Sequence, residues 1–187
     1  MSYILHMSDF HFGKNQSLEK ERLNSLASWI LENKIHIEYL IFTGDMIDAP
    51  TVQSNCLQRI RKIEPEFAKT LKTITDNDNL LDYIRNKGET YVSLYDDCLK
   101  EATTYYMKQA GDVFANFIDT INVDRRKVVL CCGNHDRMRF AAEKKFECGD
   151  NHLIEEMSIS DPFEAYDILC QTINKNLSYK TMTYQQG

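Results

Sequence analysis

The sequence predicts an α/β fold built on a parallel sheet, and three features of the chain lead to that prediction. Short apolar runs at 3–7, 37–43 and 127–132 have the composition of buried strands. Residues 18–32 repeat their apolar positions every three to four residues, as an amphipathic helix does. The order strand, helix, strand is typical of a βαβ unit, whose two strands lie parallel. The stretch 50–125 is mostly helical in pattern and separates the last strand from the others.

The first helix is expected to begin just before its apolar stripe. Ser17 is the predicted N-cap, because a hydroxyl at that position accepts a hydrogen bond from the first turn. Glu19 and Glu21 lie in that turn, where carboxylates suit the positive end of the helix dipole. The buried stripe is predicted to consist of Leu23, Leu26, Ala27, Ile30 and Leu31.

We interpret the whole chain, 1–187, as one domain with a helical insertion at 50–125. Pro65 ends the first apolar stripe of the insertion, because proline breaks a helix interior but suits a first turn. The longest helix is predicted over 94–121, where eleven apolar or aromatic side chains recur at helical spacing.

The chain after the third strand carries weaker patterns. Residues 137–151 are polar and are expected to be rich in loops. Asp161 and Pro162 are followed by Glu164, which is the arrangement of a capped helix start. That helix is predicted to run to about Asn176.

Composition and charge narrow the classes of protein that the chain can belong to. The sequence is 43% hydrophobic and 27% charged, with a net charge of -6, which suits a globular domain and excludes a uniformly basic nucleic-acid surface. No run approaches the about 18 apolar residues of a membrane-spanning helix, and the N-terminus lacks the pattern of a signal peptide. We therefore expect a cytoplasmic protein without a membrane partner, whose six cysteines are reduced.

Three short polar motifs follow the three apolar runs. They are Ser8-Asp9-Phe10-His11, Gly44-Asp45-Met46-Ile47-Asp48 and Gly133-Asn134-His135-Asp136. Ligands of open α/β sheets bind at the carboxyl ends of strands, so these motifs are expected to converge. Carboxylate, imidazole and amide groups together suit a divalent cation. Each motif alone also fits an ordinary solvated turn, and the prediction depends on their combination.

In this order the motifs resemble the signature D-x-H, G-D-x-x-D, G-N-H-[D/E] of the calcineurin-like metallophosphoesterases. The resemblance implies a β-sandwich flanked by helices and two divalent metal ions, with manganese favoured and iron or zinc as alternatives. It implies that Asp9 and His11 bind the first metal, that Asp45 bridges both, and that Asn134 binds the second.

The resemblance also implies two catalytic residues. His135 would contact the scissile phosphate and protonate the leaving group, and Asp48 would orient His135 through a hydrogen bond. The family closes its metal site with later histidines, including a G-H-x-H motif. This chain has only His152 after His135 and no such motif, so the sandwich is expected to be incomplete at its C-terminus. A truncated domain and a degenerate member both fit this departure.

The class of phosphoester is less sharply indicated. Residues 4–13 resemble the opening of the SbcD-type DNA repair nucleases, which favours a DNA nuclease and, by analogy, a partner ATPase. A cyclic-nucleotide or other small phosphodiesterase is the alternative enzyme, and a non-catalytic scaffold of the same fold is the alternative outside catalysis. Five basic side chains in the insertion suit either a phosphate backbone or a solvated helix face, namely Arg59, Arg61, Lys62, Lys69 and Lys72.

Overall fold

A computed structural model of the chain describes residues 2–131, 133, 135, 136, 138 and 140–142. Beyond these it describes residues 172 and 173 and the backbone of two short strands at 144–148 and 152–156. Asn134 lies outside the described residues, as do Cys132, Cys170 and the predicted helix start at Asp161. Residues 172 and 173 are helical, in agreement with the predicted span to Asn176, and the rest of that span lies outside the description.

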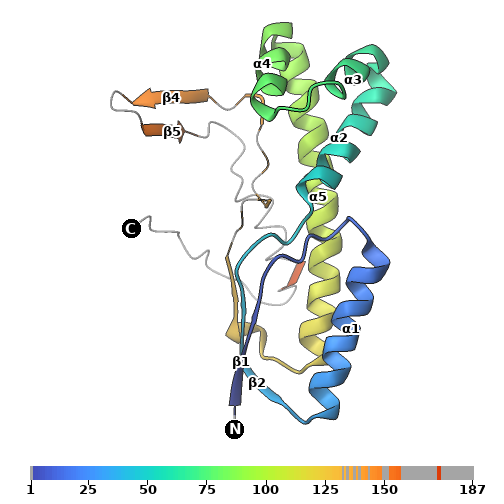
Figure 1. Cartoon of the computed structure of the whole chain (residues 1–187), viewed down its shortest axis with the longest axis vertical. Helices are drawn as coiled ribbons and strands as arrows, with labels where there is room; N and C mark the ends of the chain where they lie inside the picture. Colours follow the sequence, from blue (N-terminus) through green and yellow to red (C-terminus); the bar gives the residue numbers. More distant parts are fainter. Residues whose placement is uncertain are drawn as a thin grey trace.

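The centre of the fold is a three-stranded parallel sheet. Its strands are β1 (Ser2–Met7), β2 (His36–Phe42) and β3 (Val128–Leu130), hydrogen bonded in the order β1-β2-β3. Both pairings are parallel, as the strand, helix, strand order predicted. The sheet therefore presents the carboxyl ends of all three strands at one edge, and Figure 1 shows the chain leaving β1 and β2 there toward the helices.

Helix α1 (Gln16–Glu32) connects β1 to β2 and begins two residues before the predicted start. Asn15, not Ser17, is its N-cap: the Asn15 side chain accepts a hydrogen bond from the Leu18 N–H. The buried Glu19 carboxylate reaches back to the N–H groups of Gly13 and Asn15. This return contact fixes the earlier start, because it satisfies the backbone donors of the entry loop.

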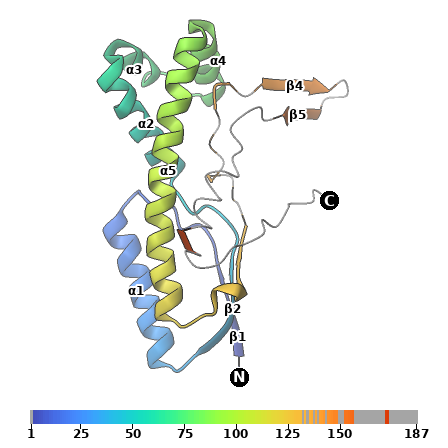
Figure 2. The ribbon, with the colours of Figure 1, turned by 180° about the vertical axis from the view of Figure 1, so that it is seen from behind.

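The region predicted as a helical insertion contains four helices. They are α2 (Ala49–Ile63), α3 (Pro65–Leu71), α4 (Asn77–Lys87) and α5 (Glu89–Thr120). Pro65 opens α3, as predicted. The 32 residues of α5 extend along the molecule, with α2, α3 and α4 around one end and α1 beside the other (Figures 1 and 2). Helix α5 begins at Glu89, before the predicted residue 94, because Tyr91 and Val92 of its first turns also pack against the core.

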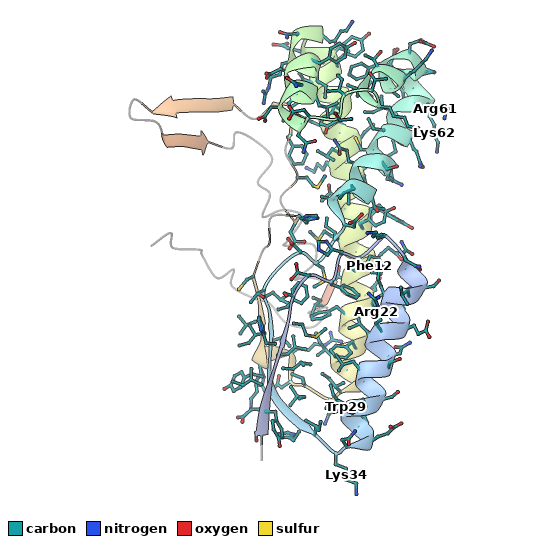
Figure 3. The ribbon with its side chains drawn as sticks, viewed as in Figure 1. Phe12, Arg22, Trp29, Lys34, Arg61 and Lys62 are labelled. Atoms are coloured by element: carbon teal, nitrogen blue, oxygen red, sulfur yellow. The ribbon has the colours of Figure 1, made fainter. Side chains whose placement is uncertain are left out.

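One hydrophobic core joins the sheet to the helical region. Phe114 of α5 packs edge-to-face against Phe42 of β2 with ring centroids 5.3 Å apart, and both side chains are fully buried. Phe12, which follows β1, belongs to the same buried cluster and lies beside α1 and α5 in Figure 3. The helices are thus an insertion in chain order, but they share their core with the sheet.

The prediction of loops at 137–151 is wrong for part of that stretch. The structure has an antiparallel hairpin there, formed by β4 (Lys144–Cys148) and β5 (His152–Glu156). Charged residues interrupt its alternating pattern, so the strand signal there is weak. The α/β class is confirmed. The described residues form the parallel sheet, this hairpin and the helices, and a two-sheet sandwich is not seen among them.

Two further sequence predictions can be compared with the described residues. Cys56, Cys98 and Cys131 are free thiols, in agreement with the expected reduced state, while Cys132, Cys148 and Cys170 have no described side chains. Within the described part of the chain, none of the helices has the length and apolar character needed to cross a bilayer.

Candidate metal centre

The loops that follow β1 and β2 run side by side and are joined by backbone hydrogen bonds. Phe12, which is completely buried, forms an isolated parallel bridge with Ile47 and anchors the two loops in the core. The pairing places Asp9 and His11 directly beside Asp45. The bonds are Asp9 N–H to the Gly44 carbonyl (3.0 Å), His11 N–H to the Asp45 carbonyl (2.9 Å) and Phe12 N–H to the Met46 carbonyl (2.9 Å).

Three of these residues have left-handed backbone conformations. The φ angles are 56° at Asp9, 48° at His11 and 58° at Asp45. Such angles are uncommon for residues other than glycine, and a non-glycine residue there costs on the order of 1–3 kcal/mol. Strain of this kind clusters at functional sites, because the surrounding structure holds the side chains in directions that a relaxed backbone would not give.

Gly133 brings the third motif against Asp45. A Cβ atom at residue 133 would lie 2.2 Å from Asp45 Oδ1 and 2.3 Å from the Asp45 backbone nitrogen, so only glycine fits. Two residues later, the His135 N–H donates a 2.9 Å hydrogen bond to Asp45 Oδ1. The second and third motifs are therefore in direct contact, as their positions at strand ends predicted.

Asp136 stabilises this contact, although the sequence motifs predict no role for it. Its side chain is 1% exposed. Oδ1 accepts hydrogen bonds from the N–H groups of Met46 (2.8 Å) and Ile47 (3.2 Å), and Oδ2 accepts one from Gly133 (2.9 Å). Burial raises the pKa of Asp136, while the backbone hydrogen bonds act in the opposite direction. The signal in the sequence was an acid directly after Gly-Asn-His, a residue type that readily accepts backbone N–H groups in turns.

The structure brings five of the six predicted site residues together. Asp9, His11 and Asp45 can each offer one ligand atom within 4.8 Å of the others, and the same holds for His11, Asp48 and His135. The two groups share His11. Its ring lies edge-on to that of His135 with centroids 4.6 Å apart, and its Nε2 is 3.8 Å from Asp9 Oδ1. The sixth residue, Asn134, lies outside the description, and so does the side chain of His152.

Two buried nitrogen atoms at this site have no hydrogen-bond partner among the described residues. They are Nδ1 of His11 and Nδ1 of His135. A buried polar atom without a partner costs about 1–3 kcal/mol, and a missing ion or water is a common explanation. Imidazole nitrogens beside carboxylates are the donor set of manganese, iron and zinc sites. The residues at this site therefore fit a divalent cation.

Asp48 has a structural partner that the sequence analysis did not anticipate. It is the N-cap of α2, and its Oδ2 accepts hydrogen bonds from the Thr51 N–H (3.1 Å) and hydroxyl (2.6 Å). The hydrogen bonds of the described residues do not include the expected one between Asp48 and His135, although both belong to the same group of potential ligands. Asp48 therefore connects the site to the start of the helical region.

Helix α5 also packs against the loop that carries the first motif. Tyr106 of α5 packs against Gly13, where an added Cβ would lie 2.9 Å from the tyrosine Cε1 and the φ angle is 117°. Burial raises the pKa of Tyr106 and the neighbouring Tyr105 raises it further, while Arg59 acts in the opposite direction. Tyr106 is one of the aromatic residues at helical spacing in 94–121, and that pattern does not connect it with the site.

Comparisons with protein-family models, curated proteins and solved structures return no match.

Proposed function

We propose that this chain is a divalent-metal-dependent phosphoesterase that hydrolyses phosphodiester bonds, built on a calcineurin-like metallophosphoesterase domain. The observation that carries the proposal is the convergence of Asp9, His11 and Asp45 beside His135, where two buried imidazole nitrogens have no partner in the described part of the chain. The resemblance of the three motifs supplies the reaction class, and the geometry supports it because motifs far apart in the sequence meet at one sheet edge.

Each residue of the site has a role in this proposal. A bound divalent cation supplies Lewis acidity toward a phosphoryl oxygen and acidifies water at neutral pH. Asp9, His11 and Asp45 would hold it, with Asn134 as a further ligand of a second cation. His135 would donate a proton to the leaving oxygen, since imidazole exchanges protons near neutral pH. Asp48 would keep a negative charge close to the His135 ring.

The exposed face of the sheet supports the expected sandwich. Leu40 and Phe42 of β2 are fully buried on the face that α5 covers. Because side chains alternate along a strand, Tyr39 projects from the opposite face, where it is 42% exposed. Ile4, which pairs with Tyr39, is 64% exposed. An exposed apolar face is what a first layer shows when the second layer of a sandwich is not among the described residues.

A DNA substrate is the subtype that we favour. Arg61 and Lys62 are exposed near the C-terminal end of α2 (Figure 3). Helix α2 begins at the site with its cap Asp48, so Arg61 lies about 20 Å along the helix from it at 1.5 Å per residue. A nucleic-acid strand held at the site is long enough to reach these charges, whereas a cyclic nucleotide is not.

The test measures manganese-dependent hydrolysis of bis-p-nitrophenyl phosphate, single-stranded DNA and double-stranded DNA by the full chain. Asp45→Asn and His135→Ala are expected to lower the rate by at least about 100-fold, because the first weakens the proposed metal site and the second removes the proposed proton donor. Asp97→Asn, an exposed acid on α5, is the matched control and should leave the rate unchanged.

The outcomes separate the enzyme from the scaffold. Equal rates in the wild type and in Asp45→Asn would refute the assignment of the site. A folded wild-type chain that binds no Mn²⁺ and hydrolyses none of the three substrates would favour a non-catalytic scaffold. Hydrolysis of the small diester without cleavage of DNA would favour a small phosphodiesterase instead of a nuclease.

A further inference from the structure

The chain that follows the third motif is hydrogen bonded to the helical region. Asp96 of α5 accepts the N–H of Ala141 on Oδ1 (2.6 Å) and the N–H of Ala142 on Oδ2 (2.9 Å). One carboxylate thus holds two successive peptide groups. Phe140 and Ala141 are buried, while Asp96 is half-buried and Ala142 is exposed, so this contact lies at the edge of the packed core.

Helix α4 also binds Ala141, through the Ala141 carbonyl group. Arg85 of α4 donates a 2.9 Å hydrogen bond from Nε to the Ala141 carbonyl, and its guanidinium also pairs with Asp82. Both polar groups of Ala141 are therefore bonded to charged side chains of two different helices. Hydrogen bonds to charged groups are stronger than those between neutral groups, so the position of Ala141 is well fixed.

Asp96 is partly buried, which makes its two acceptor contacts necessary. Burial raises the pKa of Asp96, and the hydrogen bonds from Ala141 and Ala142 act to lower it. A carboxylate that leaves water without compensating hydrogen bonds is costly. The two backbone N–H groups provide that compensation.

The contact of Asp96 with Ala141 and Ala142 is close to the site along the chain. Five peptide steps separate Ala141 from Asp136, and five steps reach at most about 18 Å. Asp136 is itself fixed by the backbone of Met46 and Ile47, and His135 precedes it directly. The segment from Asp136 to Ala141 is thus held at both ends, at Asp136 by the second motif and at Ala141 by Asp96, and His135 directly precedes it.

We propose that Asp96 is a positioning residue for the reaction: it fixes the chain after the third motif, so that the His135 ring stays beside His11 and Asp48. This inference rests on the proposed function. It gives the helical region a part in catalysis, because α5 then supports the first motif through Tyr106 and the third through Asp96.

The test compares Asp96→Asn with Asp97→Asn, the exposed neighbour on the same helix. The asparagine keeps the shape of Asp96, but its amide nitrogen faces a backbone N–H, so one of the two hydrogen bonds is lost. We expect kcat for bis-p-nitrophenyl phosphate to fall about tenfold, since small misplacements of a catalytic group are costly. KM and the Mn²⁺ half-saturation should change by less than about twofold, because Asp9, His11 and Asp45 lie on other loops.

A second readout does not depend on activity. Amide hydrogen exchange at Ala141, Ala142 and His135 should be faster in Asp96→Asn and unchanged in Asp97→Asn. If the wild type hydrolyses no diester, the proposed function fails. Amide hydrogen exchange then still shows whether the contacts of Asp96 order His135. Wild-type kcat in Asp96→Asn, or unchanged exchange at His135, would overturn the positioning role.

Arg85→Met provides the same test if Asp96→Asn does not fold. It removes the hydrogen bond to the Ala141 carbonyl from α4, and Asp82→Asn is its control because it alters the Arg85 ion pair without touching Ala141. A fall in kcat with faster exchange at His135 is expected for Arg85→Met alone. Equal behaviour of Arg85→Met and Asp82→Asn would count against the proposal.

Discussion

Gly133→Ala tests the contact between the second and third motifs directly. The added Cβ would lie 2.2 Å from Asp45 Oδ1, and ordinary Cβ contacts are no shorter than 3.0 Å, so the atoms must separate by about 0.8 Å. The backbone nitrogen of Asp45 is nearly as close, at 2.3 Å, so a side-chain rotation of Asp45 does not relieve the clash. Overpacking of this kind costs about 1–3 kcal/mol in the free energy of unfolding.

The same displacement should weaken metal binding. Metal–ligand distances tolerate only about 0.2 Å, and disturbing the support of a ligand typically costs about 10–100-fold in affinity. Urea unfolding should therefore show a midpoint lower by about 1 M, at a slope of about 2 kcal/mol per M. Titration with Mn²⁺ should show at least tenfold weaker binding.

Gly88→Ala is the matched control for Gly133→Ala. No atom lies within 4 Å of a Cβ at residue 88, but its φ angle of 105° penalises a side chain. This variant should lose about 1–2 kcal/mol of stability from backbone strain and bind Mn²⁺ as the wild type does. A Gly133→Ala chain that unfolds at the wild-type midpoint and binds Mn²⁺ with wild-type affinity would refute the close contact.

Two further predictions concern stability. Asp136→Ala leaves the buried N–H groups of Met46 and Ile47 without acceptors, so the free energy of unfolding should fall by about 2–4 kcal/mol in urea; a loss below about 1 kcal/mol would contradict this. The hydrogen bond from the Arg126 side chain lowers the pKa of Asp124 to about 2 in the folded protein. The ionised Asp124 carboxylate therefore stabilises the fold fully above its unfolded pKa of about 3.9, and this stabilisation is lost as the pH falls toward 2. The urea midpoint of Asp124→Asn should therefore change less than that of the wild type between pH 4 and pH 2, and parallel changes would argue against the Arg126 contact.

The elements of the fold were predictable where their signals are local. Strands β1 and β2 and the helices of the insertion follow from apolar periodicity, which neighbouring residues decide. The cap of α1 was misplaced because Asn15 owes its role to Glu19, which folds back onto the loop after β1. The hairpin of β4 and β5 was missed because lysines and glutamates occupy much of both strands.

The site was predictable as far as topology determines it. Parallel strands end at one edge, so Asp9, Asp45 and His135 had to come close once β1, β2 and β3 were recognised. The supporting contacts were not predictable, because they join residues far apart in sequence. Asp136 bonds to backbone groups 89 and 90 residues earlier, and no local pattern reveals such a pair.

The backbone strain bears on the choice between an enzyme and a scaffold. The described residues include five non-glycine residues with positive φ, and two of them, Lys34 and Asn122, follow helix ends where this conformation is ordinary. The other three are Asp9, His11 and Asp45, which follow strands and for which glycine would be less strained. A scaffold gains nothing from strained aspartate and histidine at these positions. A cation site needs those side chains, so the strain supports the proposed cation site.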